Sequence, residues 1–114
     1  MSSYVGTIYK GRTWSIQVQW LMDGVPVNLT GYTLLFNLKI SDGSTWEYPL
    51  SSPSNGITIT DVVNGKFTIK INKEDSGNFP ERVLHFEVVG TIGVDAYTVF
   101  LGSLDVVRPG GANL

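Results

Sequence analysis

The residues of this sequence that are capable of catalysis are few, and their spacing does not favour it. His85 is the one histidine, and Glu87 lies two residues further along an alternating segment, so the two side chains share a face. Such a pair is able to act as a general base, but the sequence places no nucleophile with it, and the chain contains no cysteine. We therefore expect His85 to be a solvent-facing polar residue and the protein not to be an enzyme.

Carboxylates in loops are a second source of chemistry, because hard cations such as Ca²⁺ prefer oxygen ligands. Four aspartates adjoin a glycine or lie in a loop, namely Asp23, Asp42, Asp61 and Asp95. Their spacing lacks the density of a calcium-binding loop, and aspartate is a favoured turn residue at such positions. The pair Gly110-Gly111 lacks the lysine and the strand-to-helix context of a phosphate loop. We predict turns at the aspartates, with no metal and no cofactor.

Aromatic side chains on one strand face suggest a third kind of site. Trp46 and Tyr48 alternate along one segment, and together they would form a platform on which a sugar ring stacks. The competing interpretation is that large aromatic residues fill the core of the protein. Equally apolar faces carry other aromatic residues, namely Trp14, Trp20, Tyr32 and Phe36. A carbohydrate-binding module that uses Trp46 and Tyr48 is therefore the alternative function.

Composition limits the possible partners. The 114 residues match one domain, and 16% of them are charged, compared with roughly 25% in typical soluble domains. Such sparse charge favours a surface that meets another protein. The net charge is −2 and the eight lysines and arginines are scattered, so we expect no nucleic-acid partner. No apolar stretch is long enough for a membrane span or a cleavable secretion signal, so we expect no membrane partner.

The secondary structure that positions these groups is clearest in the segment Gly56–Ile71, GITITDVVNGKFTIKI. Its apolar residues alternate with Thr and Lys, and Asn64-Gly65 supplies a turn signal, so we predict a β-hairpin. The period of two places Phe67, Ile69 and Ile71 on the buried face.

The same period predicts further strands along the chain. They cover residues 13–20, 32–40, 45–50, 83–92 and 97–106. Asp42-Gly43 is predicted to join the strands at 32–40 and 45–50 as an antiparallel hairpin. Val25-Pro26-Val27 is predicted to be an edge segment, because proline lacks an N–H. Asn28-Leu29-Thr30 matches a glycosylation sequon, which we interpret as a turn. Residues 72–81 are acidic and rich in Gly and Pro, and they favour a crossover loop or one helical turn.

The last strand contains a change of phase. Tyr97, Val99 and Leu101 occupy odd positions and Leu104 and Val106 even ones, which predicts a β-bulge or bend at the intervening Gly102. The fold class is therefore an all-β, immunoglobulin-like antiparallel β-sandwich of about seven strands. Its organisation is an N-terminal arm or edge strand (1–12), the sandwich (13–108) and a C-terminal tail (109–114).

Several short segments follow one another in a distinctive order along roughly residues 11–110, namely DGVPVNLTGYT, F-x-L-K-I, GITITD, NGKFTIKI, HFEV and FLGSLDVVRPG. In this order they resemble a small domain of tailed bacteriophages, the N-terminal domain of baseplate upper proteins and its stand-alone relatives. Baseplate upper proteins continue into further segments, whereas this chain stops at Leu114. We therefore expect a stand-alone tail, baseplate or neck component, or a capsid decoration protein.

The resemblance implies a non-enzymatic structural protein of the virion, made in the cytoplasm of the bacterial host, which docks onto other phage structural proteins. It carries no catalytic motif. An assembly of many copies or a homo-oligomer fits the sparse charge and the two short irregular ends. Those ends supply our candidate intersubunit contacts, Tyr4, Tyr9, Arg108 and Leu114.

Overall fold

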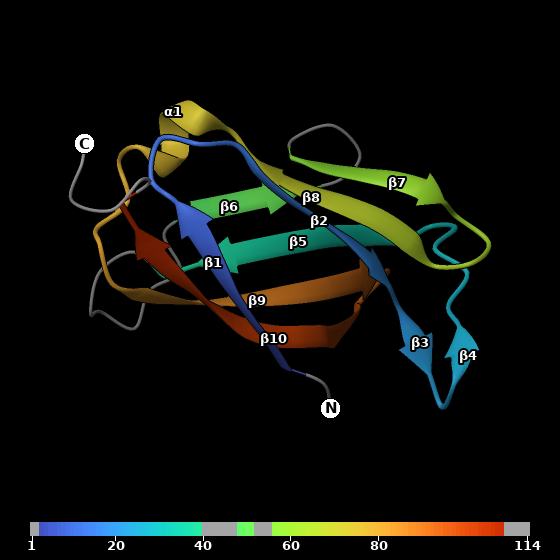
Figure 1. Cartoon of the computed structure of the whole chain (residues 1–114). Coiled ribbons are helices and arrows are strands. Elements are labelled where there is room, and N and C mark those ends of the chain that lie inside the picture. Colours follow the sequence, from blue (N-terminus) through green and yellow to red (C-terminus); the bar gives the residue numbers. More distant parts are fainter. Residues whose placement is uncertain (1–2, 40–47, 52–55, 109–114) are drawn as a thin grey trace.

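The computed structural model describes residues 3–39, 48–51 and 56–108. These residues form ten strands and one short helix, with the turns and loops that connect them (Figure 1). The larger sheet has the order β1 (Ser3–Tyr9), β10 (Asp95–Val107), β9 (Val83–Ile92), β5 (Thr33–Leu38) and β6 (Tyr48–Ser51). The second sheet has the order β2 (Trp14–Gln19), β8 (Lys66–Ile71) and β7 (Ile57–Asp61). Strands β3 (Leu21–Met22) and β4 (Val25–Pro26) form a separate hairpin.

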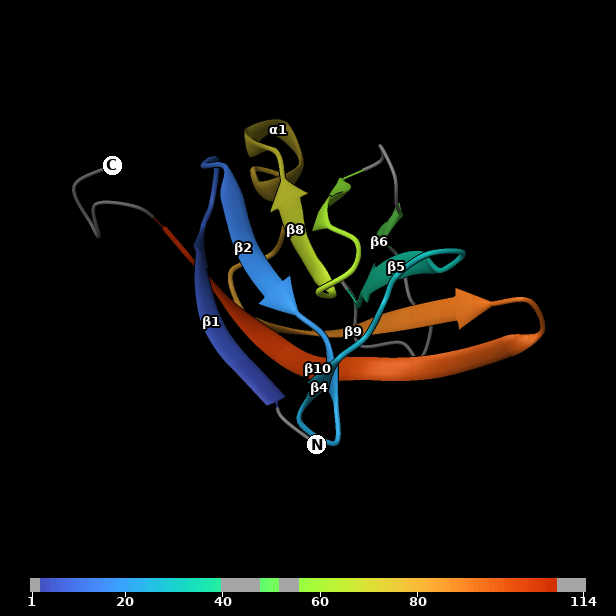
Figure 2. The same cartoon turned by 90° about the vertical axis from the view of Figure 1, so that its right-hand side faces the viewer.

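The two larger sheets pack face to face as a β-sandwich, which confirms the all-β, immunoglobulin-like prediction (Figure 2). The described strands number ten rather than about seven. The additional strands are β1, which pairs along its whole length with β10, and the two-residue strands β3 and β4. The β1–β10 pairing is also parallel, unlike the antiparallel pairing that we predicted for the sandwich.

The core lies between the sheets, and the predicted hairpin supplies much of it. Phe67, Ile69 and Ile71 are completely buried, as the alternation predicted. From the facing sheet, the Phe36 and Phe86 rings stack with their centroids 5.0 Å apart. Trp14, the first residue of β2, and Trp20, which directly follows its last residue, are buried, which confirms their role in the core. Trp20 meets the Tyr32 ring edge-on at 5.2 Å.

The turns follow the predicted chemistry. Asp23 and Gly24 have φ angles of 51° and 80°, the two positive values that a tight β3–β4 turn requires. Asn28 Oδ1 accepts hydrogen bonds from the backbone N–H of Thr30 at 3.0 Å and from its hydroxyl at 2.7 Å, which confirms a turn at the sequon. The returning strand β6 pairs antiparallel with β5, as predicted, although Asp42 and Gly43 lie outside the described residues.

The crossover between the sheets contains the helical turn α1 (Lys73–Ser76). Asn72 caps it, because its side-chain oxygen accepts a hydrogen bond from Asp75 N at 2.8 Å. The chain passes from β8 in one sheet through α1 to β9 in the other, which confirms the predicted crossover. Within the described ranges, no helix has the length and apolar character to cross a membrane.

The predicted bulge at Gly102 is wrong in position. Val88 pairs with Phe100 and Val89 with Thr98, so the extra residue of β10 is Val99. Phe100 consequently points inward, and Leu101 is exposed. Gly102 stays in regular register opposite Phe86, and a Cβ there would lie 2.4 Å from a Phe86 ring atom. This glycine therefore allows a close approach of the Phe86 ring.

Candidate protein-interaction surfaces

His85 and Glu87 lie on the outer face of the larger sheet, as predicted for a solvent-facing strand. His85 is exposed, and the Glu87 carboxylate accepts a 3.5 Å hydrogen bond from Asn37 Nδ2. The sequence reasoning missed Ser103, which is the cross-strand neighbour of His85. In the described part of the molecule, no hydrogen bond joins Ser103 to His85, so the base–nucleophile contact that activates a serine is not made.

Two of the four aspartates have the turn roles that we predicted. Asp23 lies in the β3–β4 turn, and Asp61 begins the β7–β8 turn. The Asp61 carboxylate accepts hydrogen bonds from Asn64 Nδ2 at 2.9 Å and Asn64 N at 3.3 Å, and these bonds lower its pKa. Asp95 begins β10 and Asp42 lies outside the described residues. The described ranges contain no group of three His, Cys, Asp or Glu residues suited to a metal ion.

The pair proposed as a sugar platform lies partly outside the described residues. Trp46 lies outside the described residues, and Tyr48 is described as the first residue of β6. Carbohydrate binding at this pair therefore stays a prediction.

The four candidate intersubunit residues have different surroundings. Tyr4 points into the sandwich, where its ring centroid lies 6.3 Å from that of Trp14 and 6.1 Å from that of Phe86. Tyr9 is exposed at the end of β1. Arg108 Nη2 lies 3.2 Å from Glu81 Oε2, in an exposed ion pair. Leu114 lies outside the described residues.

Strand β1 forms one edge of the larger sheet, and no described strand pairs with its other side. Lys10 N donates a 2.9 Å hydrogen bond to Val107 O, so the backbone of Lys10 faces β10. Because the backbone groups of successive strand residues point to opposite sides, Val5 and Thr7 direct their N–H and C=O groups to the open edge. Val5 is also 80% exposed. The seven residues of β1 contain neither a charge nor a proline.

An open cleft of about 500 Å³ lies between β1 and β2, the neighbouring edges of the two sheets. Ile16, Val18 and Trp20 line it from the smaller sheet, and Tyr4, Val99 and Phe100 from the larger one. Both β1 and β2 have an unpaired edge among the described strands, so apolar side chains and free backbone edges occur together on this flank.

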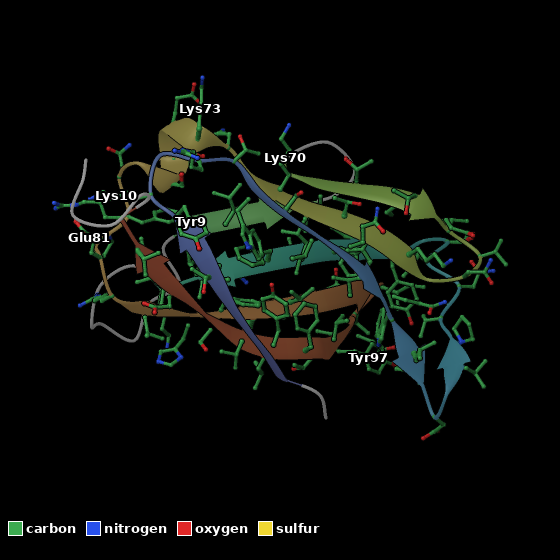
Figure 3. The ribbon with its side chains drawn as sticks, in the orientation of Figure 1. Tyr9, Lys10, Lys70, Lys73, Glu81 and Tyr97 are labelled. Atoms are coloured by element: carbon green, nitrogen blue, oxygen red, sulfur yellow. The ribbon has the colours of Figure 1, made fainter. Side chains whose placement is uncertain are left out.

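The two ends of the sandwich differ in charge and in apolar exposure. The turn end consists of the β3–β4, β7–β8 and β9–β10 turns, and the helix end consists of the β1–β2 connection, α1 and residues 77–82 (Figures 1 and 2). Figure 3 shows Tyr9, Lys10 and Glu81 together at the helix end, and Tyr97 towards the turn end. The sequence shows the individual charges, but the fold decides which of them lie together.

No protein-family model matches this sequence, and no curated protein matches it. A function for the chain is therefore inferred from its sequence resemblance and from the geometry of its surface.

Proposed function

We propose that this protein is a structural component of a tailed-bacteriophage particle, a non-enzymatic module that attaches virion proteins to one another. Its place is the tail, baseplate or neck, or the outer surface of the capsid. Its partners are other phage structural proteins and further copies of itself. The sequence resemblance suggests this role, and the structural observation that supports it best is the open edge of β1.

The β1 edge is suited to binding another protein strand. Natural sheets protect their edges with charged residues, prolines or bulges, because an open edge pairs readily with another chain. The opposite edge strand, β6, contains Pro49, whereas β1 is uncharged and contains no proline. A partner strand would find the backbone groups of Val5 and Thr7 directed outward, and main-chain hydrogen bonds supply affinity in this mode of recognition.

The location of the protein is tested in phage particles from bacteria that carry the gene. We expect mass spectrometry of separated heads and tails to find the chain in one of the two fractions at a fixed ratio to a known virion protein. Finding the protein in the cell lysate and in neither fraction would contradict the proposal.

The role of the β1 edge is tested by Thr7→Pro, with Thr7→Val as the matched control. Proline removes the outward N–H of Thr7 and is tolerated at sheet edges, whereas valine keeps that N–H. We expect both variants to keep the wild-type circular dichroism spectrum and the Pro variant to be depleted from particles. Equal incorporation of the two folded variants would refute attachment through β1.

A further inference from the structure

We infer that copies of this protein stack head to tail, with the turn end of one copy docked on the helix end of the next. The inference deepens the proposed multi-copy role and rests on it for its biological setting. It is carried by the exposed apolar residues of the turn end, by the opposite charges of the two ends and by the area that an end offers.

The turn end gathers exposed apolar side chains. Eleven large hydrophobic residues of the described chain are exposed, and seven of them belong to the three hairpins of this end. They are Leu21, Met22 and Val25 at β3–β4, Val62 and Val63 at β7–β8, and Val94 and Tyr97 at β9–β10. Val94, at the β9–β10 turn, is fully exposed. Exposed apolar residues that gather at one end of a molecule favour a role in protein contacts, so this distribution points to a docking surface.

The hairpins of the turn end are held in place by backbone contacts. Leu29 N donates to Val62 O at 2.8 Å, and Trp20 N donates to Gly65 O at 2.9 Å, so the β7–β8 turn is fixed against the chain on either side of the β3–β4 hairpin. The Trp20 ring in turn lies 6.4 Å from that of Tyr97 in β10. A surface whose loops are fixed in this way loses less conformational entropy on binding.

Charge complements the apolar residues. Each hairpin of the turn end carries an aspartate, Asp23, Asp61 or Asp95, and the one basic residue there is Lys66 within the described ranges. The other seven lysines and arginines lie at or near the helix end, namely Lys10, Arg12, Lys39, Lys70, Lys73, Arg82 and Arg108. Four described acids lie among them, namely Glu74, Asp75, Glu81 and Asp105. Opposite charges on facing surfaces accelerate association and select the relative orientation of the partners.

A second copy is the occupant that fits both properties. Its helix end presents the exposed cations Arg12, Lys70 and Lys73 together with the exposed apolar residues Tyr9 and Val83. The molecule measures 45 × 28 × 25 Å, so an end has a cross-section on the order of 700 Å², close to the roughly 800 Å² that each partner of a standard interface buries. Because the two surfaces differ, the contact is heterologous, and repeating it makes a row or a ring of copies.

The inference is tested with two triple variants of the purified full chain. The turn-end variant carries Asp23→Asn, Asp61→Asn and Asp95→Asn, since asparagine keeps the turn geometry. The helix-end variant carries Arg12→Gln, Lys70→Gln and Lys73→Gln. The control carries Glu74→Gln, Glu87→Gln and Asp105→Asn, which change the net charge as much as the turn-end variant does and leave the turn end unaltered. Because Glu74 and Asp105 lie at or near the helix end, their loss makes that end more positive, so the control should associate at least as strongly as the wild type.

Sedimentation velocity is measured at ionic strengths of roughly 0.01 M and 1 M, between which the Debye length falls from about 30 Å to about 3 Å. We expect the wild type and the control to self-associate at low salt and less at high salt, and each end variant alone to associate about tenfold more weakly. A mixture of the two end variants contains one intact pair of ends, so it should form 1:1 dimers and no larger species.

A monomeric wild type at low salt and high protein concentration would overturn the inference. End variants that associate as strongly as the wild type would overturn it too, because another surface must then make the contact. Incorporation of the protein into particles despite either result would leave the proposed virion role intact. Head-to-tail association of a protein that is missing from particles would reject that role and keep the stacking.

Discussion

The hydroxyl of Ser76 lies 2.8 Å from the carbonyl oxygen of Arg12, to which it donates a hydrogen bond across 64 residues of sequence. The Ser76 hydroxyl oxygen also accepts a 3.1 Å hydrogen bond from Gly11 N. Ser76 is the one buried polar residue among those described, and it fixes the β1–β2 connection to α1. Because β1 and β2 belong to different sheets, this contact ties the two sheets together at the helix end.

Ser76→Ala should destabilise the protein by about 1–3 kcal/mol, because the N–H of Gly11 and the carbonyl of Arg12 lose a buried partner. The measurement is denaturant unfolding followed by circular dichroism. Ser15→Ala is the control, since Ser15 is exposed on β2 and its loss should be nearly neutral. Equal stabilities of the two variants would show that water replaces the Ser76 hydroxyl at no cost.

Gly102→Ala should cost about 1–3 kcal/mol, because the added methyl group overlaps surrounding atoms. Its Cβ would lie 2.4 Å from the Phe86 ring and 2.7 Å from the backbone oxygen of Tyr4. Thermal unfolding measures the effect, and Ser103→Ala on the outer face of the same strand is the control. A wild-type melting temperature for Gly102→Ala would mean that Phe86 and β1 move aside freely.

Ile69→Ala should destabilise the sandwich by about 2–5 kcal/mol, because it leaves a cavity at a completely buried position of β8. Its cross-strand partner Ile57 is also completely buried, so the cavity lies among core residues and away from the exposed side chains of the protein. Thr58→Ala, at an exposed position of β7, should change the free energy of unfolding far less. Similar losses for both variants in chemical denaturation would contradict the inward register of this hairpin.

Asn64→Ala should raise the pKa of Asp61 part of the way towards its ordinary value of 3.8, because it removes the Asn64 side-chain hydrogen bond, the largest cause of the lowered pKa, and keeps the bond from the backbone N–H. A lowered carboxyl pKa in the folded state stabilises the protein above the unfolded-state pKa, and this contribution is lost as the pH falls through the folded-state pKa. The destabilisation caused by Asn64→Ala should therefore be larger at neutral pH than in acid.

The pKa of the Asp61 carboxyl is measured by NMR titration, and the stability by urea unfolding at neutral and acidic pH. Asn78→Ala is the control, because Asn78 also lies in an exposed turn but bonds to Glu74 O instead. An unchanged Asp61 titration in Asn64→Ala would show that the Asn64 side-chain hydrogen bond does not control this carboxyl group.

The alternation of side chains in the sequence was sufficient to predict most of the strands and which of their faces is buried. Phe67, Ile69 and Ile71 alternate with polar residues over a few positions, and a period of two places them on one face whatever the rest of the chain does. Asp23-Gly24 is similarly local, because two residues with positive φ angles define a tight turn by themselves. The candidate contact Tyr9 was found from its place at an irregular end, and it is exposed.

Tertiary structure decided the features that depend on residues far apart in the chain. The parallel pairing of β1 with β10 joins Ser3 to Leu101, and no local period in either segment reports it. The bulge falls at Val99 and leaves Gly102 in register opposite Phe86, which packs against it, and this contact between strands cannot be read from either segment alone. The separation of charge between the two ends likewise arises because each strand carries its termini to opposite ends of the sandwich, where turns distant in sequence become neighbours.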